Sequence, residues 1–171
     1  KHIKIKKDNL IIDFNGKKNV RNTCKVNNKR IIRTLKQKKK NLNDSDCLFT
    51  YRIGNKYYKI KSKDVNEYLR QFGDFTAKNI RTWGANINFI KNIIKHSKNN
   101  DLCNSKNIKK IIKDSIYDVS EKLHNTSNVC KSSYLDPELI NYYENNPTKF
   151  ISQFSDKNIT NEYINFLESL I

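Results

Sequence analysis

The sequence predicts an α+β protein that is mostly helical, with a small N-terminal β element leading into a helical body. Three observations support this fold class. The first 26 residues alternate in hydrophobicity and contain Asn15-Gly16, a strong hairpin signal. From residue 62 onward, apolar side chains recur at helical spacing. The chain also combines 36% hydrophobic residues with 4 glycines and 2 prolines, a composition that can bury a core.

The β element is expected to contain strands on both sides of a tight turn. Residues 3–5 alternate apolar and basic side chains, and residues 10–14 form a second β-rich run. Asn15-Gly16 predicts a two-residue turn, after which residues 20–26 return as a strand. This arrangement places Lys17 at or beside the tip of a hairpin.

The rest of the chain is predicted as follows: a short helix at 27–35, a polar connection at 36–45, a strand pair around Gly54-Asn55, helices starting near Ser62 or Asp64, at Thr76 and at Lys106, a polar segment at 124–133, and helices at 137–143, from Pro147 and at 158–171. No internal repeat and no domain break are evident. We therefore expect a single domain over residues 1–171, with the β element at 1–26 and the helical body at 27–171.

The charge balance points to a polyanionic partner. Lys and Arg number 34 against 17 Asp and Glu, which gives a formal charge of +17. A basic surface that only confers solubility, in a sequence rich in Lys, Asn and Ile, is the alternative. No apolar run reaches membrane-spanning length, no secretory signal is seen, and the 4 cysteines are far apart. We expect an intracellular protein with no membrane contact, no metal site and no nucleotide cofactor.

Three stretches concentrate polar residues that could carry chemistry: residues 14–18, 75–86 and 123–137. In the first, Lys17 could donate a proton or contact a phosphate, or it could be a solvated tip. In the second, Arg81 beside Asn86 suits a phosphoryl group, because a guanidinium donates to two oxygens; a peripheral arginine of an amphipathic helix is the alternative. In the third, Tyr134 taken alone is an ordinary tyrosine.

Taken in order, these stretches resemble the small type IB DNA topoisomerases of poxviruses, giant viruses and bacteria. The resemblance rests on F-x-G-K, F-T-A-K-x-x-R-T-W-G-A-N and L-x-N-T-x-x-V-C-K-x-S-Y, and residues 64–69 also resemble the family's linking helix. It covers nearly the whole chain. It implies the catalytic fold of the DNA breaking-rejoining enzymes, which tyrosine recombinases share. It also implies a monomer that relaxes supercoiled double-stranded DNA without ATP or metal.

The resemblance implies a role for each matched residue. Tyr134 matches the nucleophile that forms a 3′-phosphotyrosyl bond, and Arg81 the arginine that grips a non-bridging phosphate oxygen. Asn125 matches a hydrogen-bond donor to that phosphate, and Lys17 the general acid on the leaving 5′-oxygen. The DNA-binding positions that surround these residues match Lys78, Asn86 and Lys131. A phenol ionises only near pH ~10, so dense positive charge around it suits this chemistry.

Two departures from the family pattern stand out. The family has Gly before the His/Asn position, whereas this chain has His124, either a solvent-facing side chain or an additional donor. The family also has a catalytic Arg upstream of the lysine hairpin, whereas the first Arg here is Arg21. We therefore expect a C-terminal fragment that lacks this Arg and an N-terminal clamp domain.

Two alternatives stay open. A tyrosine recombinase would share the fold and the roles of Arg and Tyr, but such enzymes usually carry H-x-x-R where this chain has Lys78-Asn79-Ile80-Arg81. A non-catalytic basic DNA-binding module would bind DNA and form no covalent complex. In either case the protein is expected inside the cell or the virion where DNA is present, in a viral factory, a virion, a nucleus or a bacterial cytoplasm.

Overall fold

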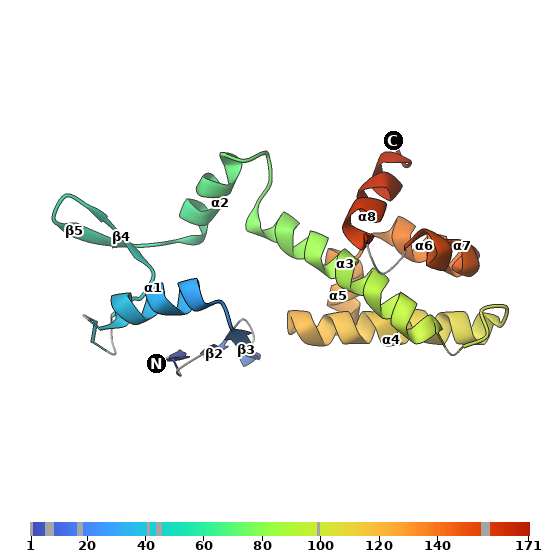
Figure 1. Cartoon of the computed structure of the whole chain (residues 1–171), viewed down its shortest axis with the longest axis horizontal. Helices are drawn as coiled ribbons and strands as arrows, with labels where there is room; N and C mark the ends of the chain where they lie inside the picture. The colour runs from blue at the N-terminus through green and yellow to red at the C-terminus, as the bar shows by residue number, and fades with distance from the viewer. Residues whose placement is uncertain are drawn as a thin grey trace. The chain divides into compact units, whose positions relative to one another are not determined.

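The computed structural model describes residues 2–5, 9–16, 19–40, 42–43, 46–98, 100–154 and 158–171. Within these residues the protein is mostly helical with small antiparallel sheets (Figure 1), which confirms the predicted α+β class. The chain divides into two compact units, Lys1–Phe72, which we call the sheet unit, and Gly73–Ile171, which we call the helical unit. The single domain over residues 1–171 and the DNA breaking-rejoining fold remain predictions.

Three strands of the sheet unit form an antiparallel sheet in the order β1–β2–β3: β1 (Ile3–Ile5), β2 (Leu10–Asn15) and β3 (Arg21–Val26). The predicted strands are thus confirmed, but the predicted two-residue turn is wrong. Asn15 pairs with Arg21, so the connection between β2 and β3 runs from Gly16 to Val20. The N–H of Gly16 donates to the carbonyl of Val20 at 2.8 Å and closes this wider loop. Lys17 lies outside the described residues.

Helix α1 (Lys29–Lys39) packs on this sheet and forms its small core. Ile32 and Leu35 of α1 are buried together with Leu10 of β2. The helix continues four residues beyond the predicted end at 35, and lysines occupy its last turn. Cations near a helix C-terminus interact favourably with the helix dipole, so these lysines stabilise the additional turn. The sequence pattern did not predict this turn, because residues 36–39 are polar and carry no apolar periodicity.

The rest of the sheet unit consists of β4 (Thr50–Ile53), β5 (Lys56–Lys59) and α2 (Ser62–Arg70). The predicted strand pair is confirmed, with Gly54 in the left-handed region at φ 57°. The cap of α2 is Lys61 instead of the predicted Ser62 or Asp64. The carboxylate of Asp64 accepts the N–H of Lys61 at 2.7 Å, so Asp64 still stabilises the helix start.

The helical unit consists of α3 (Ala77–Ser97), α4 (Ser105–Leu123), α5 (Ser127–Tyr134), α6 (Pro137–Asn145), α7 (Pro147–Gln153) and α8 (Ile159–Glu168). Helices α3 and α4 lie side by side (Figure 1) and are joined by His96–Asp118 at 3.0 Å and Lys122–Asn88 at 2.8 Å. The core between the helices contains large side chains such as Phe89, Ile93, Leu139, Tyr143, Phe150 and Phe154. Within the described part of the chain, no helix has both the length and the hydrophobicity needed to cross a bilayer.

Helix α5 corrects the prediction of a polar connection at 124–133. The hydroxyl of Thr126 caps the helix by accepting the N–H of Val129 at 3.3 Å. Cys130 is 0% exposed and anchors the helix in the core. One buried residue in so short a helix produces no visible periodicity, which explains why the sequence pattern missed it.

Candidate active site

Two predicted residues, Lys78 and Arg81, lie in the first turns of α3. The helix begins at a capping box, where the backbone N–H and the hydroxyl of Thr76 donate to the side-chain oxygen of Asn79 at 2.9 and 2.6 Å. Lys78 and Arg81 are exposed and three residues apart, so they lie on the same side of the helix. By fixing the start of α3, the cap also fixes the positions of both cationic side chains on the surface of the helical unit.

Arg81 and Tyr134 come together in the structure. The Cζ atom of Arg81 lies 5.2 Å from the ring centroid of Tyr134, the last residue of α5. The Nη2 atom of Arg81 also donates to the carbonyl of Leu123, the last residue of α4. One side chain therefore connects α3 with the ends of α4 and α5. A cation over an aromatic face is an attractive arrangement, and it keeps positive charge beside the phenol.

Asn86 holds the backbone that follows Tyr134. Its Nδ2 donates to the carbonyls of Thr82 at 3.1 Å and Tyr134 at 3.2 Å, and its Oδ1 accepts the N–H of Asp136 at 2.9 Å. The side chain is 2% exposed. The Asn86 side chain is buried, and both ends of its amide bind the protein's own backbone. This favours a role in positioning Tyr134, instead of the contact with DNA that the sequence predicts for Asn86.

Asn125 lies in the connection between α4 and α5, two residues after the carbonyl that Arg81 binds. Its backbone N–H donates to the carbonyl of Ser120 at 3.0 Å. Its Nδ2 is buried and has no hydrogen-bond partner among the described residues. An unpaired buried donor costs about 1–3 kcal/mol, so such a group calls for a specific explanation, and a ligand oxygen is one.

The backbone conformation of His124 gives this residue a structural role at the end of α4. It adopts the left-handed conformation at φ 52° and ends α4, with its N–H donating to the carbonyl of Glu121 at 3.1 Å. Glycine adopts this conformation most easily, and His is among the residues that tolerate it. This requirement fits the glycine that the family pattern predicts at this position. The His124 side chain is half-buried, so it is not simply a solvent-facing group.

Helix α5 presents Tyr134 and Lys131 from a fixed base. Cys130 at 0% exposure and Leu135 at 6% are buried on either side of the half-buried Tyr134, while Lys131 is exposed. Burial raises the pKa of the Cys130 thiol, and the positive charge of Arg81 partly opposes this rise. The guanidinium therefore acts electrostatically on the inner face of α5 as well as on the tyrosine ring.

Lys17 cannot be placed in this site, because it lies outside the described residues and belongs to the other unit.

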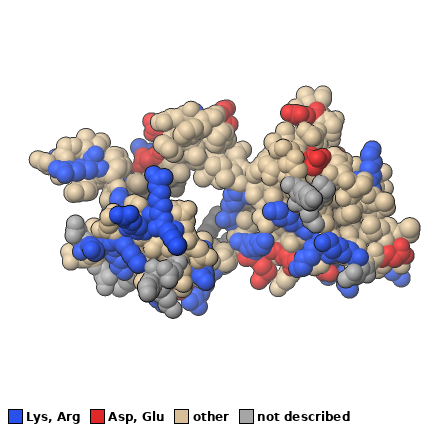
Figure 2. Space-filling view, in the orientation of Figure 1, with Lys and Arg blue, Asp and Glu red and all other residues tan. Residues whose placement is uncertain are grey.

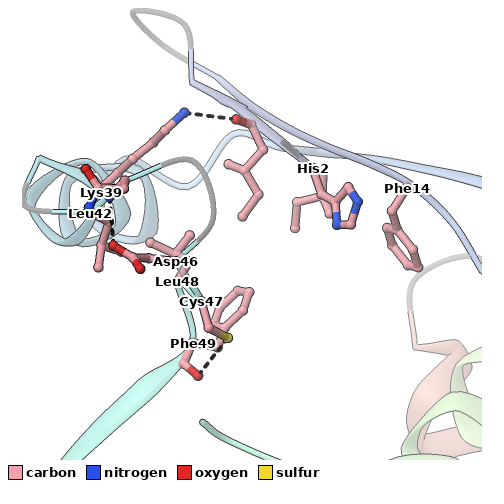
Figure 3. A pocket seen from close by; sticks show the side chains of 11 residues that line it. His2, Phe14, Lys39, Leu42, Asp46, Cys47, Leu48 and Phe49 are labelled. Atoms are coloured by element: carbon pink, nitrogen blue, oxygen red, sulfur yellow. Dashed lines mark hydrogen bonds between the residues drawn. The ribbon is translucent and has the colours of Figure 1, made fainter. Parts of the chain in front are cut away.

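The sheet unit itself has a mostly apolar hollow of about 330 Å³ (Figure 3), lined by His2, Ile3, Ile12, Phe14, Lys39, Leu42, Asn43, Asp46, Cys47, Leu48 and Phe49. Its polar groups bind backbone: Lys39 donates to the carbonyl of Ile3 and Cys47 to that of Phe49. The Asp46 carboxylate accepts the N–H of Asn43.

The chain's surplus of Lys and Arg is visible on the surface of both units. Figure 2 shows Lys and Arg side chains gathered over α1 in the sheet unit and around α4 in the helical unit. No group of three or more His, Cys, Asp or Glu suited to a metal ion occurs among the residues that the structure describes. The described site places a cationic donor, Arg81, beside the phenol of Tyr134, and an unpaired amide donor, Asn125, lies two residues after the carbonyl that Arg81 binds.

Comparison with known proteins identifies the class. The family described as "Eukaryotic DNA topoisomerase I, catalytic core" matches residues 1–157. The chain belongs to this family. It is also 31% identical over 163 residues to a protein named DNA topoisomerase 1B of Acanthamoeba polyphaga mimivirus, an alignment that covers 91% of this chain and 48% of that protein. The predicted resemblance to viral type IB topoisomerases is confirmed, and the chain spans about half the length of this curated relative.

Proposed function

We propose that the chain carries catalytic machinery of a type IB DNA topoisomerase, which relaxes supercoiled double-stranded DNA by cutting and resealing one strand. The observation that carries the proposal is the guanidinium of Arg81 over the ring of Tyr134, 5.2 Å from its centroid. The family membership and the surplus of cations support DNA as the substrate. The protein would then work wherever the DNA is, as a monomer.

The proposed reaction exchanges one phosphodiester for another. The phenolic oxygen of Tyr134 gives its proton to solvent water and attacks the phosphorus, forming a 3′-phosphotyrosyl bond as the bond to the 5′-oxygen breaks. Lys17 gives a proton to that leaving oxygen. Arg81 and the unpaired amide of Asn125 donate to the non-bridging oxygens, which gain negative charge in the transition state. Resealing reverses these steps, so no ATP and no metal ion are required.

The other predicted residues have supporting roles in this proposal. Lys78 and Lys131 are exposed on α3 and α5 and suit contacts with DNA phosphates. Asn86 acts as a positioning residue: through the carbonyl of Tyr134 and the N–H of Asp136 it fixes the point where α5 ends. A displaced phenol would slow the reaction, because attack requires the reacting atoms to be aligned.

The test is to trap the covalent complex. The full-length protein that contains this chain is incubated with a duplex whose short cleaved strand dissociates, and the adduct is detected after denaturation. A topoisomerase forms the adduct through Tyr134 and relaxes plasmid without partner sites. A recombinase would instead exchange strands between paired sites, and a binding module would shift the duplex without any adduct. Either of these outcomes would contradict the proposal.

A further inference from the structure

The sheet unit carries a second basic surface that the proposed reaction does not use. It is formed by β4, β5 and the segment that leads into α2. Residues 47–63 contain no Asp or Glu, and their cations are Arg52, Lys56, Lys59, Lys61 and Lys63. A run of positive charges without nearby negative charges attracts a polyanion.

Aromatic rings stand in the open between these cations. Tyr57 is 70% exposed, and Tyr51 and Tyr58 are 41% and 42% exposed. The guanidinium carbon of Arg52 lies 5.9 Å from the ring centroid of Tyr57, and the rings of Tyr51 and Tyr58 are stacked with centroids 5.6 Å apart. Exposed apolar rings that gather on one element mark an interaction surface.

The strand register sorts these side chains onto two faces. Arg52 pairs with Tyr57, and Thr50 with Lys59, so these residues share one face of the hairpin. Tyr58 and Lys56 belong to the opposite face, because side chains alternate along a strand. Each face of this short hairpin therefore has a distinct chemistry.

The face with Tyr57 borders a groove of about 810 Å³ beside the end of α1. Its lining consists of Gln37, Lys38, Leu42, Asp46, Cys47, Leu48, Thr50, Tyr51, Arg52, Tyr57 and Lys59. Lys38 donates to the carbonyl of Thr50 at 2.9 Å and ties the helix to the hairpin. The groove is thus preformed. Asp46, the acidic member of this lining, has its carboxylate engaged by the N–H of Asn43 at 2.8 Å.

The chemistry of the groove distinguishes between kinds of polyanion. Lys38 and Lys59 can contact phosphates, and each ammonium has three donors, so the bond from Lys38 to Thr50 leaves donors over. The open ring of Tyr57 can stack on a base only if that base is unpaired, because bases inside a duplex already stack on both sides. Cations interleaved with exposed aromatic rings are the arrangement that binds single strands.

We infer that the groove between α1 and the β4–β5 hairpin binds single-stranded nucleic acid. In this complex, the ring of Tyr57 stacks on a base and the ammonium group of Lys59 contacts a neighbouring phosphate. Arg52 is held beside the ring of Tyr57 by two hydrogen bonds: its Nε donates to the carbonyl of Gly54 and its Nη2 to the side chain of Asn55. This site belongs to the sheet unit, and its binding requires no cleavage.

The stacking arm of the test compares two oligomers with equal numbers of phosphates, oligo-dT and an abasic chain of the same length. Fluorescence anisotropy with the full chain is expected to give about tenfold tighter binding of oligo-dT. Tyr57→Leu removes this difference and Tyr57→Phe retains it. Tyr117→Leu is the matched control, because Tyr117 is 56% exposed on α4 and far from the groove in sequence.

The phosphate arm measures the salt dependence of oligo-dT binding. Lys59→Gln should lower the slope by about 0.7, the value for one phosphate contact in a single strand, whereas Lys56→Gln on the opposite face should leave it unchanged. Equal binding of oligo-dT and the abasic chain by the wild type would overturn the inference. So would a duplex of equal length that competes for the component lost in Tyr57→Leu. Neither arm measures cleavage, so failure here leaves the proposed function standing, and a chain without cleavage activity could still pass.

Discussion

The two units of the chain bury their apolar residues to very different extents. In the helical unit, side chains from all its helices meet in one large core. In the sheet unit, the buried core among the described residues is Leu10, Ile32 and Leu35. Large hydrophobic side chains exposed there include Phe14, Val20, Ile31, Phe49, Tyr51, Ile53, Tyr57, Tyr58, Ile60, Val65, Tyr68 and Phe72.

This difference separates stability from surface function. Burial of apolar area is the main favourable term in folding, so the helical unit can hold Arg81, Asn86 and Tyr134 rigidly with its own packing. The sheet unit gains less from burial and presents more apolar and cationic surface for contacts with other molecules. We therefore expect the helical unit to carry the fixed part of the chemistry, and the sheet unit to supply the proposed general acid Lys17 and contacts with other molecules.

The sharpest test of this division is Tyr134→Phe in the full-length protein. The change removes only the hydroxyl from a ring that packs against the core, so folding and DNA binding should stay as they are. The covalent adduct and plasmid relaxation should be lost completely, because no other group is proposed to form the phosphotyrosyl bond. Relaxation near the wild-type rate would place the nucleophile elsewhere.

Lys17→Ala asks whether the sheet unit also takes part in the chemistry. Loss of a general acid should slow cleavage by about 10²–10⁴-fold while DNA affinity stays nearly constant. A substrate with sulfur in place of the 5′-oxygen has a leaving group that needs no proton, so it should restore cleavage. The neighbouring Lys18→Ala is the control. Failure of the sulfur substrate to rescue Lys17→Ala, or equal rescue of both variants, would remove the general-acid role.

Arg81→Ala should slow cleavage and resealing together, by about 10²-fold or more, because a donor to the phosphate acts in both transition states. Arg81→Lys should recover only part of the rate, since an ammonium lacks the guanidinium fork. Lys91→Ala, an exposed cation elsewhere on α3, is the matched control. Normal cleavage with a lower melting temperature in Arg81→Ala would assign this arginine a purely structural role.

Asn86→Ala should have a smaller effect, about tenfold on the rate of adduct formation, with unchanged affinity for duplex DNA. The variant leaves the carbonyl of Tyr134 and the N–H of Asp136 without their partner, so the phenol is held less firmly. Rates at saturating DNA and the dissociation constant are measured separately. Weaker DNA binding at an unchanged saturated rate would instead support the DNA contact predicted from the sequence.

The sequence revealed the elements that have strong periodicity and missed those that depend on single contacts. The starts of the long helices α3 and α4 and of the proline-started α6 and α7 were predicted to within one residue, since apolar spacing and caps mark them. Helix α5 was missed because Thr126 and the buried Cys130 are its main local signals. The β2–β3 connection was mispredicted because Asn15-Gly16 favours a tight turn, whereas the pairing of Asn15 with Arg21 sets a wider loop.

The sequence motifs supplied a set of candidate site residues and not their geometry. The ordered motifs identified Arg81 and Tyr134, but no pattern could show that the guanidinium lies over the ring or binds the end of α4. The backbone clamp by Asn86 and the left-handed His124 both arise from tertiary packing. A histidine at a position where the family pattern predicts glycine was the available signal for the left-handed conformation of His124.

The smallest expected effect concerns how the sheet unit responds to acid. Asp13 on β2 accepts two hydrogen bonds from Arg21 on β3, at 2.9 and 2.8 Å, and the hydrogen bond from Arg21 is the main reason that the pKa of Asp13 is lowered from 3.8. A lowered pKa in the folded state means that the ionised pair stabilises the sheet above the unfolded pKa. This stabilisation is lost as the pH falls below about 4 through the folded pKa.

The test is a double-mutant cycle of Asp13→Asn and Arg21→Gln, in which the stability of the sheet is followed by amide exchange of β2. The coupling between the two side chains should be present at pH 6, disappear near pH 2 and weaken in about 1 M salt. Coupling that persists at the acidic end would show that the two side chains interact by packing and not by charge.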